Sequence, residues 1–248
     1  MSPAARAVPD ALERRLRGDA GRPLVTFYDD ATGERVELSV ATYANWVAKT
    51  AGLVQDELDV EPGSLVVVDL PTHWLGAVWL GAAWSLGLAV TDDAGLLDEA
   101  GLVVCGPDRL EEHAHRAAAT AVVALSLRPL GGRFTEALPT GVVDYGAVVL
   151  AQPDVFVPFE PVEGDDVAWR DGEGTATQTG LLTDAAAGAV VESGGRLLTD
   201  RNPCSRAGIA TLLAPLVREA SAVWVRHAEP AGWDARAAQE KATDVLRG

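Results

Sequence analysis

Lysine is almost absent from this chain of 248 residues, which contains only Lys49 and Lys241. Lysines and arginines together number 20, against 36 aspartates and glutamates, which gives a formal net charge of −16. This balance argues against nucleic acids and anionic membrane surfaces as partners, because both require basic patches. Cysteine is also scarce: Cys105 and Cys204 stand far apart, without a Cys-x-x-Cys pair or a Cys/His ligand spacing. The sequence therefore predicts no metal site, no disulfide framework and a reducing, cytoplasmic location.

One hydrophobic run approaches the length of a membrane span. Residues 74–90 read WLGAVWLGAAWSLGLAV, about as long as the shortest transmembrane helices. The run contains three glycines, lacks basic flanks and is followed by Asp92 and Asp93. A helix buried in a protein core therefore fits it better than a membrane helix. The charged residues 1–22 contain no apolar core segment and are not expected to be a signal peptide.

Hydrophobic residues make up 48% of the chain, and their patterns alternate between those of strands and helices. Residues 23–28 and 35–38 flank turn residues and predict a hairpin, and apolar residues recur at helical spacing over 40–58. Further strands are expected at 65–70, 102–105, 121–125, 167–170, 196–198 and 222–225, and further helices at 108–118, 145–151, 181–192, 205–220 and 235–246. This alternation predicts an α/β fold of mixed or mainly parallel sheets covered by helices.

The proline- and acid-rich residues 153–166 are the best candidate for an internal linker. We therefore expect an N-terminal helical extension over 1–22, a first α/β lobe over 23–152 and a second, smaller α/β lobe over 167–248.

Residues 171–180 read DGEGTATQTG and are rich in glycine and threonine. The backbone amides and hydroxyls of such a loop can hold phosphate, while a lysine usually supplies the positive charge. The candidate phosphate-binding residues are Gly174, Thr175, Thr177, Thr179 and Gly180. The alternative is a solvated turn between a strand and a helix, and we favour it because Asp171 and Glu173 repel an anion.

The histidines and cysteines form no recognisable catalytic constellation. Cys204 and His227 would make a thiol nucleophile and its base only if the fold brought them together, and a free cysteine is more often an inert core residue. His113 and His115 are two residues apart, on different faces of a helix, so we expect them at the surface. His73 lies at a strand-to-helix junction and is expected to cap or pack against the helix.

The run TFYDDATGERVELSVATYANWVAKTAGLVQDELDVEPGSLVVVDLPTHWLGAVWLGAAWSLGLAV resembles the N-terminal region of the adenylate-forming, AMP-binding superfamily, the acyl-CoA synthetases and their relatives. The resemblance covers about residues 23–91 and, more faintly, residues 165–226. In the latter, RLLTDRNPCSRAGIATLLAPLVREASAVWV is similar to the family's strand, acyl-site helix and following strand. It implies the fold of the first half of the family's large N-terminal domain, that is, a truncated member.

In that family the phosphate loop reads Ser/Thr-Ser-Gly-Thr-Thr-Gly-x-Pro-Lys-Gly, and residues 172–180 stand in its place without the Pro-Lys-Gly. Ser205 follows Cys204 where the family often has an aromatic residue and a histidine bordering the acyl site, so Ser205 becomes a further candidate ligand residue. The family's ribose-binding aspartate, adenine-stacking aromatic and lid lysine have no counterpart before Gly248. The resemblance thus implies no catalytic residue, no metal and no ATP or AMP cofactor, with residual nucleotide binding left open.

Three functions stay open at this point. The first is a catalytically inactive relative that serves as a ligand-binding or partner-binding module, which could self-associate or bind another protein. The second is a half-enzyme of an acyl-adenylating ligase, completed by another chain. The third is an acyl- or small-molecule-binding protein without chemistry, which uses a cleft near residues 204–209.

Overall fold

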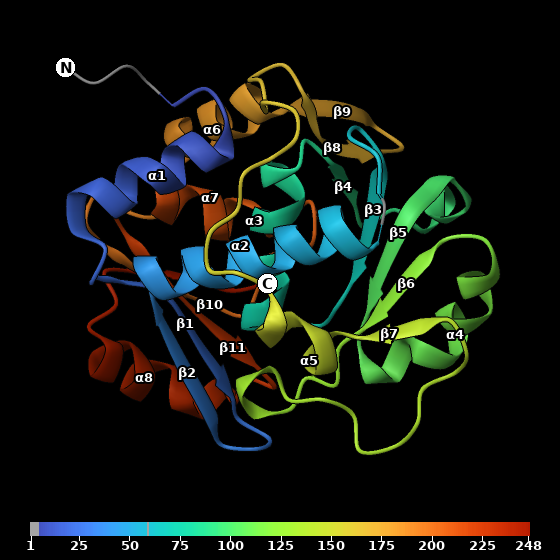
Figure 1. Cartoon of the computed structure of the whole chain (residues 1–248). Coiled ribbons are helices and arrows are strands. Elements are labelled where there is room, and N and C mark those ends of the chain that lie inside the picture. Colours follow the sequence, from blue (N-terminus) through green and yellow to red (C-terminus); the bar gives the residue numbers. More distant parts are fainter. Residues whose placement is uncertain (1–4, 59) are drawn as a thin grey trace.

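The computed structural model describes residues 5–58 and 60–248, and its strands form two sheets (Figure 1). The order in the seven-stranded sheet is β7 (Val142–Asp144), β6 (Ala121–Ala124), β5 (Ala100–Cys105), β3 (Leu65–Asp69), β4 (Ala89–Thr91), β8 (Val167–Asp171) and β9 (Gly174–Thr177). The order in the five-stranded sheet is β12 (Asp244–Leu246), β10 (Arg196–Thr199), β11 (Ser221–Arg226), β1 (Pro23–Asp29) and β2 (Glu34–Ser39). Neighbours are parallel except in the hairpins β8–β9 and β1–β2. The predicted α/β fold with mainly parallel sheets is confirmed.

Helices cover the sheets (Figure 1). They are α1 (Val8–Asp19), α2 (Val40–Glu57), α3 (Trp74–Ser85), α4 (Leu110–Ala114), α5 (Tyr145–Val148), α6 (Gln178–Ala187), α7 (Ala210–Val217) and α8 (Trp233–Glu240). Every residue of α3 is buried, and the helix shares one apolar core with Phe27 of β1 and Val66 of β3. The apolar run at 74–90 is therefore explained by a helix that lies between the two sheets. Within residues 5–58 and 60–248, no helix has the length and apolarity needed to cross a bilayer.

Local chemistry accounts for the starts of the two central helices. The Ser39 hydroxyl accepts a hydrogen bond from the Thr42 amide at 3.1 Å and caps α2, as Ser at this position favours. His73 caps α3 in the same way, because its Nδ1 accepts the Leu75 amide at 3.2 Å. Burial lowers the pKa of His73 to about 3, so the ring is neutral and can accept this bond. The expected capping role of His73 is confirmed.

The prediction of a final helix over 235–246 is wrong in its second half. The helix α8 ends at Glu240, and Lys241 adopts a left-handed φ of 53°, which turns the chain away from the helix axis. Residues 244–246 then pair with β10 as β12. A three-residue strand is too short for its apolar spacing to be distinguished from that of a helix. The helix predicted over 205–220 is also shorter, since α7 begins at Ala210.

The segment 153–166 contains no helix or strand, but both sheets take strands from both sides of it. Strand β8 follows this segment and pairs with β4, and strand β1 precedes it and pairs with β11. The boundaries of the expected lobes, 23–152 and 167–248, therefore do not coincide with the two sheets.

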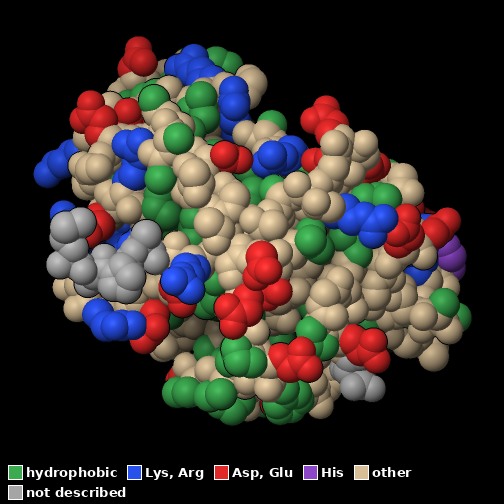
Figure 2. All heavy atoms as spheres, turned by 90° about the horizontal axis from the view of Figure 1, so that it is seen from above, with side chains coloured by type: hydrophobic (Ala, Val, Ile, Leu, Met, Phe, Trp, Pro, Cys, Tyr) green, Lys and Arg blue, Asp and Glu red, His purple; other side chains and the backbone are tan. Residues whose placement is uncertain are grey.

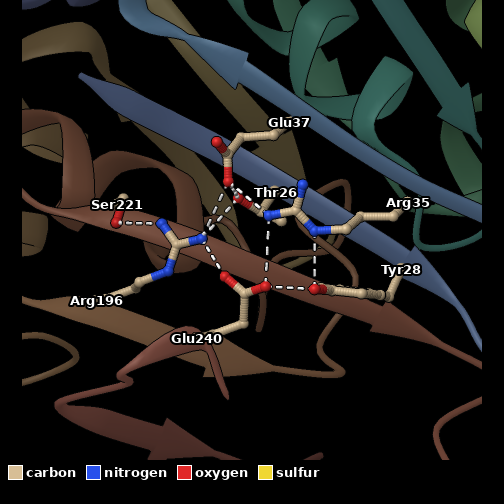
Figure 3. Close-up of polar contacts among 7 residues, drawn as sticks. All are labelled: Thr26, Tyr28, Arg35, Glu37, Arg196, Ser221 and Glu240. Carbon is tan, nitrogen blue, oxygen red and sulfur yellow. Dashed lines mark hydrogen bonds and ion pairs between the residues drawn. The ribbon is translucent and has the colours of Figure 1, made fainter. Parts of the chain in front are cut away.

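An ion-pair network holds α8 on the five-stranded sheet (Figure 3). Glu240 of α8 is buried and accepts hydrogen bonds from Arg196 of β10 and from the Tyr28 hydroxyl of β1. Arg35 donates to the Tyr28 hydroxyl at 2.8 Å and to Glu37 at 2.7 Å. The charges of the two arginines and the two glutamates cancel. The network therefore stabilises the packing of α8 on the sheet and leaves no free charge for a charged ligand.

Candidate functional site

A cavity of about 160 Å³ lies at the carboxyl end of β3, a central strand of the larger sheet. We refer to it as the central cavity. Its polar lining residues are Asp69, Asp92, Arg109, Glu112, His113, Asn202 and Ser205. They lie at or after the carboxyl ends of β3, β4, β5 and β10. The chain leaves β3 for β4 on one side and then returns to β5 on the other side of β3. Ligands of open α/β sheets bind where the strand order reverses in this way.

A buried histidine is the most informative residue of the central cavity. His113 is 1% exposed, so the prediction of a surface histidine is wrong. It is buried because α4 packs against β5 and β6. Its Nε2 lies 2.7 Å from Oδ2 of Asp69, and Arg109 donates to the same oxygen at 2.8 Å. Nδ1 of His113 is buried and has no hydrogen-bond partner among the described residues.

The Asp69 carboxylate holds this group together. Burial raises the pKa of Asp69, but the hydrogen bonds from His113 and Arg109 outweigh that effect and keep the pKa below its usual value. Asp69 is therefore ionised at neutral pH and fixes the orientation of the imidazole.

The loop after β10 forms the opposite wall of the central cavity. The side chain of Asn202 donates to the Leu70 carbonyl at 2.7 Å and accepts from the Cys204 amide at 3.0 Å, so it ties this loop to the end of β3. Ser205 lines the cavity, although its hydroxyl already donates to the Asn202 carbonyl at 2.8 Å. The same loop anchors the end of the chain, because the Gly248 amide donates to Asp200 at 2.7 Å.

The structure does not bring Cys204 and His227 together as a thiol nucleophile and its base. Cys204 is buried, and burial raises the pKa of its thiol well above the ordinary value. His227 instead lies 2.8 Å from a carboxylate oxygen of Asp29. Cys204 thus has the environment of an inert core cysteine. Among residues 5–58 and 60–248, no three potential metal ligands of the His, Cys, Asp and Glu types gather.

The charges of the central cavity disfavour an anion. Three carboxylates line it, those of Asp69, Asp92 and Glu112. The guanidinium of Arg109 is already bound to Asp69 and, at 2.7 Å, to Glu112. An uncharged or cationic molecule with hydrogen-bond donors suits this lining better than a phosphate or a carboxylate.

The glycine- and threonine-rich segment is a hairpin and not an open phosphate loop. Residues 174–177 form β9, which pairs with β8, so the expectation of a simple turn from strand to helix is too coarse. The amides of Glu173 and Gly174 donate to Oδ1 of Asp171 at 2.9 and 3.1 Å. The Gly172 amide donates to Asp93 at 2.8 Å. A hydrogen bond from the Trp169 indole lowers the pKa of Asp171, so the acceptor stays ionised.

Two of the three threonine hydroxyls of this segment form hydrogen bonds within the chain. Thr177 caps α6, because its hydroxyl accepts the Gly180 amide at 3.1 Å. Thr179 donates to the Arg6 carbonyl at 2.7 Å. Gly174 and Thr175 line a separate hollow of about 190 Å³ together with Arg206, whose Nε lies 3.8 Å from Asp171. Of the six candidate ligand residues, only Ser205 is therefore among those that line the central cavity.

Sequence reasoning missed the acidic and basic residues of the central cavity. Asp69 is the last residue of a buried strand and Asp92 follows another, which is a usable signal because parallel strands present such residues at their carboxyl ends. Nothing comparable marks Arg109 or His113, since their approach to Asp69 depends on β5 lying beside β3.

Comparisons with known proteins agree with this geometry at the level of fold. No family model matches the chain. The crystal structure of an acyl-CoA synthetase of Brucella canis gives a TM-score of 0.79 at 16% identity, over 97% of this chain and 47% of that chain. The anthranilate CoA ligase AuaEII, in complex with anthranoyl-AMP, gives a TM-score of 0.75 at 13% identity, over 98% and 50%. The chain thus spans about half the length of these enzymes.

A protein of Mycobacterium tuberculosis (strain ATCC 25618 / H37Rv), described as a TIGR03089 family protein, is 41% identical over 246 residues, or 95% of this chain and 96% of the relative. The two chains therefore align nearly end to end. The resemblance to the adenylate-forming superfamily is confirmed as a shared α/β fold. The chain belongs to the TIGR03089 family and has the fold of acyl-CoA synthetases over about half of their length.

Proposed function

We propose that this protein is a catalytically inactive relative of the adenylate-forming enzymes that binds a small polar molecule in the central cavity. In this proposal neither ATP nor AMP is a cofactor, no residue is catalytic, and neither nucleic acid nor membrane is a partner. The two buried, free cysteines fit a protein that works in a reducing cytoplasm.

The observation that carries the proposal is the occupation of the hairpin amides by the chain's own carboxylates. Three amides of residues 172–174 donate to Asp171 or Asp93. These are the donors that a polyphosphate would need, and the carboxylates repel it as well. Adenylate formation depends on a polyphosphate held with its charge compensated. The nearby Arg206 lies close to Asp171, so it does not provide a free cation.

Ligand binding without chemistry is supported by the lining of the central cavity. It combines three carboxylates with a guanidinium, an imidazole, a side-chain amide and a hydroxyl. The chemistry of the lining favours an amine or a polyol as the ligand.

The test is a thermal-shift screen of the pure protein combined with a pyrophosphate-exchange assay. We expect no exchange with any carboxylic acid and no shift with ATP plus magnesium, AMP, CoA or acyl-CoA. A library of small amines and polyols should contain compounds that raise the unfolding temperature in proportion to their concentration. Ala94→Trp, which fills the exposed mouth of the cavity, should abolish such shifts. The matched control Ala147→Trp, at an exposed alanine of α5, should retain them.

A second candidate is the half-enzyme, and it is favoured by the match to only half of the solved acyl-CoA synthetase and ligase chains. A reproducible shift with ATP plus magnesium, or exchange above background, would support it and would contradict catalytic inactivity. An amine or polyol hit that Ala94→Trp leaves unchanged would remove the central cavity as the ligand site.

A further inference from the structure

A second hollow, which shares no lining residue with the central cavity, lies between α1, α2 and residues 154–162. We call it the α1–α2 groove, and its volume is about 310 Å³. In Figure 1 the segment 153–166 crosses in front of α2 and runs up towards α6, facing α1. The groove therefore has two helical walls and one wall without regular structure.

The lining of the α1–α2 groove is mainly apolar. Its larger contributors are Leu12, Leu16, Val47, Phe156, Pro158 and Val162. The charged lining residues have partners: Glu13 pairs with Arg17 at 2.6 Å, and Asp154 pairs with Lys49 at 3.0 Å. The Ser85 hydroxyl donates to the Gly81 carbonyl at 2.8 Å. The lining thus offers apolar surface without a spare charge to attract a charged ligand.

Apolar side chains continue outward from the groove. Val155, Val157 and Phe159 are 76%, 74% and 80% exposed, and Leu150 is 63% exposed. Figure 2 shows hydrophobic side chains gathered at the lower edge of the view, among acidic ones, and this edge corresponds to the front of Figure 1. Exposed apolar patches of this kind mark sites of interaction.

The size and the charges of the groove decide between its candidate occupants. A volume of about 310 Å³ lies at the lower end of the range of small-molecule sites. A second copy of the chain would bring another molecule with a net charge of −16 and further acids such as Asp154 and Glu160 against this patch. That approach is repulsive.

We propose that the α1–α2 groove binds the hydrocarbon chain of an uncharged amphiphile, with the polar head of the ligand at the solvent side. The proposal is independent of the proposed function, because its residues do not line the central cavity. Each buried methylene contributes in proportion to the apolar surface that it removes from water. The exposed residues 155, 157 and 159 allow a chain longer than the groove to continue along the surface.

The test is a calorimetric titration of the whole protein with the linear alcohols from 1-hexanol to 1-dodecanol. We expect saturable binding that tightens about fourfold per methylene until the groove is filled. Ala48→Trp, which places an indole in the groove, should weaken the binding of 1-decanol by about tenfold or more. The matched control Ala187→Trp, at an exposed alanine of α6, should bind as the wild type does, and circular dichroism should show that both variants are folded.

Three outcomes would overturn the proposal. The first is an absence of saturable binding to any of the alcohols. The second is unchanged binding of 1-decanol to folded Ala48→Trp, above all if Ala94→Trp in the central cavity abolishes it. The third is sedimentation of the wild type as a dimer that Ala48→Trp converts to a monomer, because the groove would then belong to a second copy of the chain.

Discussion

At the scale of single residues, Asp69 holds two other lining residues of the central cavity in place. One carboxylate oxygen is shared by the His113 imidazole and the Arg109 guanidinium. Each hydrogen bond to a charged group stabilises a protein by about 1.5–3 kcal/mol. Removing the charge leaves the buried partner groups without their full hydrogen bonding. The orientation of the buried imidazole therefore depends on a residue that lies at the end of a strand.

Asp69→Asn should destabilise the protein by about 2 kcal/mol at neutral pH, measured by urea unfolding. The pKa of Asp69 is lowered in the folded state, so its stabilising effect exists above the unfolded pKa and is lost as the pH falls through the folded pKa. The difference between the variant and the wild type should therefore shrink in acid. Asp98→Asn is the control, because Asp98 is exposed and its pair with Arg116 lies at the surface. An equal loss in both variants would contradict the special role of Asp69.

At the scale of elements, the helix α8 depends on a buried carboxylate. Glu240 accepts from Arg196 and Tyr28 beneath the helix (Figure 3). Breaking a buried pair by removing one partner leaves an uncompensated charge, which costs about 3–5 kcal/mol. Glu240→Ala should therefore lower the free energy of unfolding by about 3 kcal/mol, with Glu13→Ala in an exposed pair as a nearly neutral control.

The pH dependence gives a second check on α8. Burial raises the pKa of Glu240, but hydrogen bonds from Tyr28 and Arg196 outweigh this and lower it overall. The contribution of Glu240 is therefore complete above its unfolded pKa and disappears as the pH falls through its folded pKa. If Glu240→Ala cost as much in strong acid as at neutral pH, the ion pair would not be the source of the effect.

The elements that sequence predicts well are those whose signals are local. The hairpin of β1 and β2, the cap of α2 at Ser39 and the apolar run of α3 each follow from adjacent residues. The strands β9 and β12 were missed because each is short. Each is defined by its pairing, β9 with the preceding β8 and β12 with the distant β10. Of the central cavity, only the part near residues 204–205 was anticipated; Asp69 and His113 were missed because they meet only once the strand order is set. In residues 171–180, the hydroxyl of Thr177 caps α6 and that of Thr179 donates to the Arg6 carbonyl, and neither bond could be predicted from the sequence pattern.

At the scale of the whole molecule, the strand order ties the two ends of the sequence together. Strands from residues 23–39 and from residues 196–246 form the five-stranded sheet. In the seven-stranded sheet, β8 and β9 pair beside β4, which comes from the first part of the chain. Neither part on either side of 153–166 has a complete sheet of its own. The cores of the two parts are also continuous, because Trp224, Trp79 and Leu24 belong to one buried cluster.

Thermal unfolding should therefore be a single cooperative transition, in which the calorimetric and van't Hoff enthalpies agree. Two independent lobes would instead give two transitions. Fragments 1–166 and 167–248, expressed separately, should lack the sharp unfolding transition of the whole chain, because each exposes the edges and apolar faces that the other covers. A folded, cooperatively melting fragment would support two separate lobes over 23–152 and 167–248.

The anchoring of Gly248 to Asp200 has a practical consequence for any screen of small molecules. Asp200 belongs to the loop whose Asn202 and Ser205 form a wall of the central cavity, so an affinity tag or fluorescent fusion joined after Gly248 would lie against that loop. Such a label could obstruct entry or imitate a hit by altering the loop. Labels for binding work on this protein therefore belong at positions that make no contact with this loop.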